Sequence, residues 1–149
     1  MARDDVAFHP AEPADIPRLK ALLASVGLPS GDVQHAEQDY ILAFGGGELV
    51  GSVGLEKRAD DTLLRSLAVV PAQRRHGLGG QLYERILARA VASGARDAYV
   101  LTTTAERFFA SRGFERVERS SVPEALRMTA EFRSLCPTSA VCMRRSLAQ

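Results

Sequence analysis

The segment VVPAQRRHGLGGQLYERI (69–86) constrains the fold more than any other part of this sequence. An apolar, strand-like run ends at Pro71, and two arginines, Arg74 and Arg75, follow it. Glycines then occupy positions 77, 79 and 80, after which apolar residues recur at helical spacing. A strand that passes through a glycine turn into a helix is typical of a mixed α/β domain.

The glycine turn predicts a binding site for phosphate. Glycines let backbone N–H groups approach an anion closely, and the following helix directs its unpaired N–H groups and the positive end of its dipole at the turn. Arg74 and Arg75 can add charge-assisted hydrogen bonds. Gln81 and Leu82 exclude a Walker loop, and Leu82 also takes the place of the third glycine of a dinucleotide fingerprint. Taken alone, the turn also fits a glycine-rich connection without a ligand.

The rest of the sequence predicts elements in the order β-α-(α)-β-β-β-α-β-α-β-β. A helix starts at Glu12, with apolar residues at helical spacing from Ile16 to Val26. GGG (45–47) and KRADD (57–61) fit hairpin turns. The stretch before the last strand is too long for a plain loop, so it is expected to carry helical turns. Strands are expected at 4–9, 40–44, 48–56, 62–70, 97–104, 114–118 and 140–145, further helices at 81–92 and 105–113, and 30–38 stays open as a short helix.

Composition limits the class of protein. The chain has 149 residues, 46% hydrophobic and 25% charged, which predicts a single folded domain over residues 1–149. Its net charge of +1 provides no field for nucleic acid or an anionic membrane, and no apolar run is long enough for a membrane span. With two cysteines and a polar start that is no signal peptide, the sequence predicts a cytoplasmic protein.

Two motifs in register resemble the GCN5-related N-acetyltransferases (GNAT). RRHGLG (74–79) matches the family signature R/Q-x-x-G-x-G/A, and it follows RSLAVVP (65–71) as it does in that family. AERFFASRGF (105–114) resembles the later helix–turn–strand motif. The resemblance implies the acyl-CoA N-acyltransferase fold, a mixed α/β (α+β) architecture. Its central twisted sheet is mostly antiparallel, flanked by helices, and splayed between the strands at 62–70 and 97–104.

The same resemblance implies acetyl-CoA as the acetyl donor. By matched positions, the backbone of 67–69 would pair with the pantetheine arm, and the turn would hold the pyrophosphate. His76 titrates near neutrality, and its place in the turn favours a neighbour of the cofactor over a base. No metal is expected, because no His and Cys residues have the spacing of a zinc site. The implied cofactor-binding residues are Leu67, Ala68, Val69, Arg74, Arg75, His76, Gly77, Leu78, Gly79 and Gly80.

Acetyl transfer from a thioester to an amine needs a neutral amine, a polarised carbonyl and a protonated leaving group. A free N–H of the fourth strand can polarise the carbonyl, and Val69 is the candidate. Glu56 could take the amine proton through water, although a solvated charge at a hairpin end is the simpler interpretation. Many relatives have a Tyr where this sequence has Phe109, so the proton donor is vacant or is water. The acetyltransferase domain of N-acetylglutamate synthases is similar in lacking this Tyr, which favours an amino-acid-like acceptor.

Three residues are predicted to contact the acceptor. Arg65 and Ser66 are neighbours on one strand and should face opposite sides of the sheet. Arg65 could bind a carboxylate of the acceptor through both of its terminal nitrogens, or it could make a surface ion pair. Arg133 belongs to the segment 119–139, which is expected to hold part of the acceptor and to close the site against peptides.

The tail AEFRSLCPTSAVCMRR (130–145) resembles the arsenic-resistance N-acetyltransferases. This resemblance implies that an organoarsenical could be the acceptor. Cys136 and Cys142 supply two soft sulfur donors that suit a metalloid, but ordinary buried thiols are the better interpretation.

Together these features predict an acetyl-CoA-dependent N-acetyltransferase that transfers acetyl directly to a small, amino-acid-like amine. Two alternatives stay open at this point: a protein or peptide N-acetyltransferase, and a CoA-binding sensor without turnover. The predicted partner is a small-molecule amine, with no nucleic acid and no membrane. A homodimer is one open oligomeric state.

Overall fold

The computed structural model describes residues 6–34, 38–74, 76–135 and 139–147, with only the backbone of residues 134 and 135. Arg75, His35 and Cys136 therefore lie outside the described residues. In chain order the elements are β1 (Val6–Pro10), η2 (Pro13–Asp15), α1 (Ile16–Ser25), β2 (Gln38–Gly45), β3 (Glu48–Arg58), β4 (Asp61–Val69), η3 (Pro71–Gln73), α2 (Leu78–Ala92), β5 (Asp97–Thr102), α3 (Glu106–Ala110), β6 (Glu115–Arg116), η4 (Arg119–Ser121), α4 (Glu124–Arg127), η5 (Glu131–Leu135) and β7 (Val141–Ser146).

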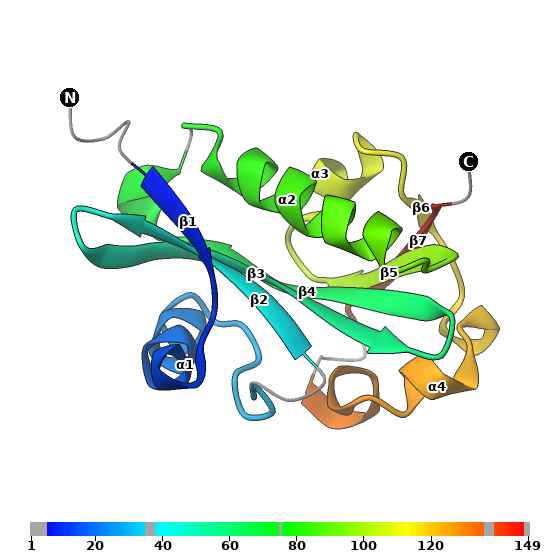
Figure 1. Ribbon diagram of the computed structural model, residues 1–149. Coiled ribbons are helices and arrows are strands. Elements are labelled where there is room, and N and C mark those ends of the chain that lie inside the picture. Colours follow the sequence, from blue (N-terminus) through cyan, green and yellow to red (C-terminus); the bar gives the residue numbers. More distant parts are fainter. Residues whose placement is uncertain (1–5, 35–37, 75, 136–138, 148–149) are drawn as a thin grey trace.

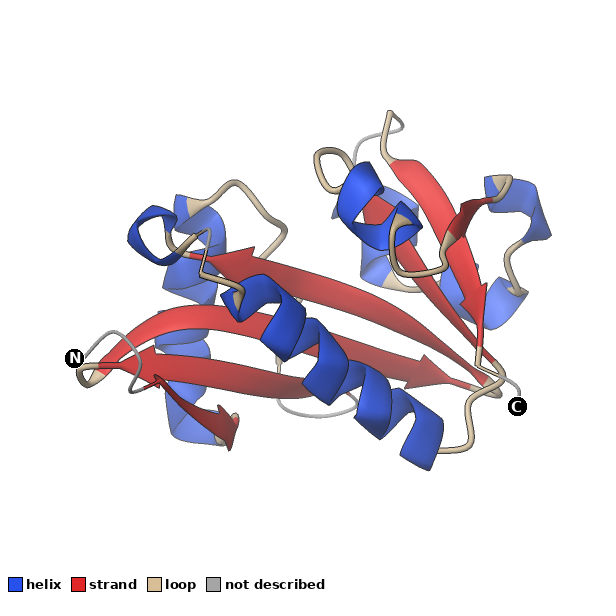
Figure 2. Cartoon of the chain, turned by 90° about the horizontal axis from the view of Figure 1, so that it is seen from above, coloured by secondary structure: helices blue, strands red, loops and turns tan. Residues whose placement is uncertain are grey.

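One seven-stranded sheet organises the chain, in the strand order β1-β2-β3-β4-β5-β7-β6. All neighbouring strands are antiparallel except β4 and β5, which are parallel. Helix α2 covers one face of the sheet and α1 the other (Figure 1). Strands β1–β4 form one group, and β5, β7 and β6 form a second. The two groups meet at one end of the sheet and diverge toward the other (Figure 2). The mixed, mostly antiparallel sheet that the sequence predicted is confirmed.

The sheet opens between β4 and β5. These strands pair only where Asp61–Leu63 lie beside Asp97–Tyr99, and no later residue of β4 has a partner on β5 in the register. The rest of β4 remains paired with β3 on its other side. The predicted splay between the fourth and fifth strands is therefore present, and it exposes one backbone edge of β4 inside the fold.

The core forms because strand residues alternate between the two faces of the sheet. Along β2, Ile41 and Ala43 are buried in the cluster that includes the apolar side of α2. Tyr40 and Leu42 are buried in the cluster that includes α1. A third cluster places Leu126 of α4 against β5 and β7. The helices thus fix the sheet from both faces and leave the β4–β5 opening between them.

Several element boundaries differ from the sequence prediction. Helix α2 begins at residue 78 rather than 81, so two glycines lie in its first turn. The turn is possible because Gly77 has φ = +79°, a left-handed conformation that favours glycine. The predicted helical turns within 119–139 are present as η4, α4 and η5. Residues 30–34 form no helix.

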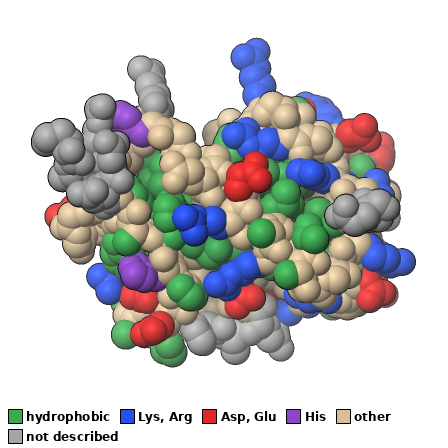
Figure 3. All heavy atoms as spheres, turned by 45° about the horizontal axis from the view of Figure 1, so that its top comes forward, with side chains coloured by type: hydrophobic (Ala, Val, Ile, Leu, Met, Phe, Trp, Pro, Cys, Tyr) green, Lys and Arg blue, Asp and Glu red, His purple; other side chains and the backbone are tan. Residues whose placement is uncertain are grey.

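Charge is mixed on the face that carries α2. Basic and acidic side chains are interspersed there with apolar ones (Figure 3). Among the described residues, no helix combines the length and apolar character that crossing a membrane requires. The single-domain organisation, the cytoplasmic location and a homodimer stay predictions.

Candidate active site

The first turn of α2 provides a set of open backbone donors. Gly77 is the N-cap residue of the helix and has no side chain that could bind the free N–H groups. The first hydrogen bond of the helix runs from the Gln81 N–H to the Gly77 carbonyl at 3.1 Å. The N–H groups of Leu78, Gly79 and Gly80 come before that bond and have no carbonyl partner within the helix. These residues line a cavity of about 650 Å³, here called the turn cavity.

Two arginines flank this helix end. The Arg74 Nε donates a hydrogen bond to the Val69 carbonyl at 2.9 Å. Arg112, from the turn after α3, also lines the turn cavity, and its guanidinium lies 3.7 Å from the Phe108 ring centroid. A Cβ at Gly80 would come within 3.2 Å of an Arg112 terminal nitrogen, so glycine leaves room for it. Positive charge therefore gathers beside the open amides, as a phosphate site requires.

The cofactor-binding prediction fits this geometry in most positions. Leu67, Ala68 and Val69 line the turn cavity together with Arg74 and residues 77–80. His76 is exposed and is absent from that lining. Sequence reasoning missed Arg112, and the only signal was a basic residue directly before the glycine of the second motif.

The open edge of β4 presents backbone groups to the cavity. The Val70 N–H donates to the Val50 carbonyl of β3 at 2.9 Å. In an antiparallel strand, the backbone N–H and C=O groups of successive residues point alternately to the two sides of the strand. Since those of Val70 point toward β3, those of Val69 and Leu67 point toward the opening. The bond from Arg74 to the Val69 carbonyl reaches it on that side. This orientation is the one that the predicted Val69 donor requires.

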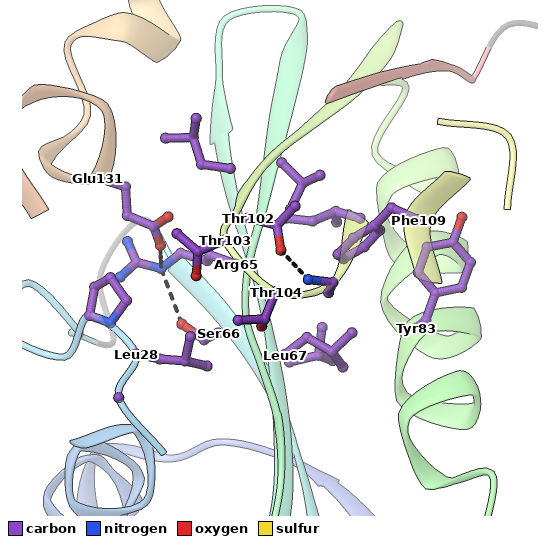
Figure 4. A pocket seen from close by; sticks show the side chains of 17 residues that line it. Leu28, Arg65, Ser66, Leu67, Tyr83, Thr102, Thr103, Thr104, Phe109 and Glu131 are labelled. Carbon is purple, nitrogen blue, oxygen red and sulfur yellow. Dashed lines mark hydrogen bonds and ion pairs between the residues drawn. The ribbon is translucent and has the colours of Figure 1, made fainter. Parts of the chain in front are cut away.

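A second cavity of about 420 Å³, here called the inner cavity, lies beside the first. Leu28, Leu67, Thr104 and Ala105 line both cavities, so the two adjoin. The hydroxyl-bearing residues 66 and 102–104 surround the inner cavity (Figure 4). Arg65 and Glu131 lie at one end of it, and Phe109 and Tyr83 at the other.

Arg65 is fully buried within a cluster of carboxylates. Its terminal nitrogens bind both oxygens of Asp32, at 2.6 and 2.5 Å, and one oxygen of Glu56 at 3.0 Å. Its Nε lies 3.1 Å from a Glu131 oxygen, and Arg58 also pairs with Glu56. The predicted surface ion pair is therefore wrong, because the side chain of Arg65 is 0% exposed. The guanidinium is already occupied by the protein's own carboxylates.

Arg65 and Ser66 do not face opposite sides, contrary to the prediction. Ser66 has φ = +60°, and the β3–β4 register shifts beside it, which marks a β-bulge. The bulge interrupts the alternation, so both residues line the inner cavity and the Arg65 Nε lies 3.3 Å from the Ser66 Oγ. Gly54 opposite has no room for a side chain, because its Cβ would lie 2.4 Å from the Tyr40 ring.

Two other predicted residues have settings that differ from their proposed roles. Glu56 is 1% exposed, because β3 continues past it to Arg58, so the solvated hairpin-end charge is wrong. Its carboxylate pairs with two guanidinium groups and does not line the inner cavity, which gives no support to the general base. Arg133 is exposed and is absent from the lining, whereas Glu131 of the same short helix faces the cavity.

The aromatic end of the inner cavity holds no replacement for the missing Tyr. Phe109 is buried against the rings of Tyr83, Phe108 and Phe114. The Tyr83 hydroxyl accepts a hydrogen bond from Arg145 at 2.8 Å and points away from the threonines (Figure 4). Burial also raises the pKa of Tyr83, which makes it a weaker proton donor.

Of the two cysteines, only Cys142 belongs to the described residues, and it lines neither cavity. Cys142 is a buried free thiol of β7, and burial raises its pKa to about 11. Among the described residues, no group of His, Cys, Asp and Glu is arranged to hold a metal ion.

An opened sheet edge beside a glycine-capped helix defines an acyl-CoA-binding class of fold, and comparison with known proteins identifies the family. The family model of the acetyltransferase (GNAT) domain matches residues 35–116, more than half of the chain, so the chain belongs to the GNAT family. The amino-acid acetyltransferase of Neisseria meningitidis serogroup A is 27% identical over 150 residues, covering 94% of this chain and 34% of the relative. That of Pseudomonas fluorescens is 38% identical over 81 residues, covering 53% and 19%. The chain thus spans about a third or less of the length of these curated relatives.

Solved structures agree with this family. The N-acetylglutamate synthase of Neisseria gonorrhoeae, complexed with coenzyme A and L-arginine, superposes with a TM-score of 0.78 at 25% identity, over 97% of this chain and 34% of that one. Tetrahymena GCN5 superposes with a TM-score of 0.73 at 12% identity, over 95% and 96%, which shows the fold alone. The resemblance to arsenic-resistance N-acetyltransferases stays a prediction.

Proposed function

We propose that this chain is an acetyl-CoA-dependent N-acetyltransferase that transfers acetyl directly to the amine of a small, amino-acid-like acceptor. One observation carries the proposal: the open amides at the start of α2 and the free edge of β4 line a cavity that adjoins the inner cavity and shares four lining residues with it. A donor held at the first cavity can therefore meet an acceptor held in the second.

The turn cavity suits coenzyme A in charge and in shape. The N–H groups of residues 78–80 would hold the pyrophosphate, together with Arg74 and Arg112. The open backbone edge at Leu67 would hold the pantetheine arm, which leaves the Val69 N–H for the acetyl group. When bound, acetyl-CoA supplies the thioester. The N-acetylglutamate synthase structure supports this assignment, because it contains coenzyme A.

The residues around the inner cavity define how transfer would proceed. The Val69 N–H can donate a hydrogen bond to the acetyl oxygen and stabilise the charge that develops on it. As the new C–N bond forms and the C–S bond breaks, the amine proton leaves to water and water protonates the thiolate. The amine needs little help, because an α-amino group with a pKa of about 7.7–8 is about one-tenth neutral at pH 7.

The size of the inner cavity favours a small acceptor over a peptide. Its volume of about 420 Å³ lies within the range of small-molecule sites. The amino-acid acetyltransferases among the relatives support an amino-acid-like molecule within that class. An organoarsenical amino acid is a candidate on the tail resemblance only.

A CoA-binding sensor without turnover is the second candidate. Two observations favour it: Phe109 stands in place of the usual Tyr, and the cavity-lining carboxylate of Glu131 is paired with Arg65. Because water can serve both proton steps, these observations do not outweigh the shape of the adjoining cavities.

One assay separates these functions. Thiol release from acetyl-CoA is measured with a panel of free amino acids, an organoarsenical amino acid and short peptides, and acetyl-CoA binding is measured in parallel by calorimetry. We expect release with free amino acids. Release with peptides alone would establish a peptide acetyltransferase, and binding without release would establish a sensor. Loss of both would overturn the proposed function.

A further inference from the structure

We propose that the Glu131 end of the inner cavity selects an acceptor whose group at that end is uncharged or cationic, and that it rejects a carboxylate. This inference rests on the proposed function, and it names the acceptor class more narrowly. It predicts that acidic amino acids, among them glutamate, are poor acceptors for this chain.

The charges around Arg65 sum to a net negative cluster. Asp32, Glu56 and Glu131 all pair with its guanidinium, and Arg58 adds the second cation of this group through Glu56. Three carboxylates thus share two guanidinium groups, and these five side chains carry an excess of one negative charge. Because the Glu131 carboxylate is 5% exposed, a second anion placed beside it would be poorly screened by water.

Most of the donors of Arg65 are already engaged. A guanidinium has five N–H donors. In Arg65 one terminal nitrogen donates to Asp32 and Glu56, the other donates to Asp32, and the Nε faces Glu131 and Ser66. At most one N–H is left, so binding of an acceptor carboxylate at two points would displace one of the protein's own carboxylates. The bidentate capture of an acceptor carboxylate, open at the level of sequence, is therefore not available in this arrangement.

The Glu131 end of the inner cavity presents hydrogen-bond acceptors. Figure 4 shows the Glu131 carboxylate directed toward the same space as Thr103 and Ser66. An ionised carboxylate only accepts hydrogen bonds, whereas the hydroxyls can donate or accept. A ligand end that carries N–H donors, such as a carboxamide, an ammonium or a guanidinium, complements Glu131. A second carboxylate would bring like charges together, an arrangement that costs binding free energy.

The test compares acceptors that match in shape and differ in charge. L-Glutamine and L-glutamate form the first pair, and L-lysine and L-norleucine the second. We expect kcat/KM to be about tenfold or more higher for glutamine than for glutamate. For the second pair, we expect kcat/KM to be higher for lysine than for norleucine. In Glu131→Gln, both ratios should move toward one. In Glu124→Gln, an exposed matched control on α4, both ratios should stay as in the wild type.

The inference is overturned if glutamate is as good an acceptor as glutamine, or if folded Glu131→Gln leaves the ratios unchanged. Should that variant fail to fold, calorimetric binding of the four amino acids to the wild-type CoA complex measures the same preference. Binding also separates this inference from the proposed function. If there is no turnover but glutamine still binds more tightly than glutamate, the proposed enzymatic function is rejected and the charge selection stands. Binding of neither member of the pairs would reject the selection.

Discussion

Filling the space at Gly79 would test whether the glycine turn binds the diphosphate of coenzyme A. Gly79 lies in the first turn of α2, and a Cβ there would be 3.9 Å from side-chain carbons of Val69 and Phe108, an ordinary contact distance. Gly79→Ala should therefore leave the fold intact. Its helix should gain stability, by at most about 1 kcal/mol, because alanine favours helix more than glycine does. Gly79→Leu would extend farther into the turn cavity that Gly79 lines.

The expected loss of affinity follows from the open amides. An anionic group at a helix N-terminus gains about 0.3–1 kcal/mol, or up to about 2 kcal/mol when partly buried. A diphosphate brings two such groups, so displacing it costs about 0.6–4 kcal/mol, which is about a 3- to 700-fold weaker Kd. The alanine variant should lie near the lower value and the leucine variant near the upper one.

Titration calorimetry with two ligands measures this effect. Acetyl-CoA should bind the variants more weakly, whereas S-acetylpantetheine, which lacks the diphosphate, should bind wild type and variants alike. Gly31→Ala is a matched control, because its Cβ would meet no atom within 4 Å. Unchanged acetyl-CoA affinity in Gly79→Leu would refute the assignment. An equal loss for both ligands would mean that the pantetheine path, and not the diphosphate site, was damaged.

Three further predictions concern the core and two buried groups. Phe109→Ala should lower the free energy of unfolding by about 3–5 kcal/mol in urea titrations and change turnover of the folded enzyme less, so a stable but inactive variant would contradict this. Because the pKa of Cys142 is about 11, only about 0.1% is thiolate at pH 8, and iodoacetamide labelling of Cys142, followed by peptide mapping, should be far slower in native than in unfolded protein; equal rates at Cys142 would be the opposite result. Burial, with Asp97 nearby, raises the pKa of Asp61, so the folded state disfavours the ionised carboxyl and loses stability as pH rises through that pKa. Asp61→Asn should therefore have a higher Tm than wild type at pH 7, and the difference in Tm should be smaller below pH 4. A difference in Tm that does not change with pH would argue against ionisation of Asp61 as its cause.

Features that depend on neighbouring residues were predictable from the sequence. The hairpin turn at 45–47 requires left-handed backbone, and Gly46 and Gly47 have φ of +60° and +82°. The alternation along β2 and the helical spacing of α2 follow the local periods of strand and helix. The turn at Gly77–Gly80 is also local, because a helix end exposes its own N–H groups. For that reason the sequence alone predicts the glycine turn and its open amides.

Features that depend on residues distant in sequence were not predictable. Arg65 and Asp32 are 33 positions apart, and no pattern in either segment marks them as partners. The bulge at Ser66 turns two neighbouring side chains into one cavity, although alternation alone predicts opposite faces. Arg112 approaches α2 only because α3 packs beside that helix, where the Phe108 and Tyr83 rings meet edge to face.

The sequence by itself determined the order of elements, the GNAT signature and the glycine turn at Gly77–Gly80, because each depends on backbone conformation over a few adjacent residues. Only the tertiary structure decided which charges surround the inner cavity. Ion pairing in a buried cluster is set by the packing of β3, β4, η5 and the loop at Asp32, and that packing brings together residues that no local period connects.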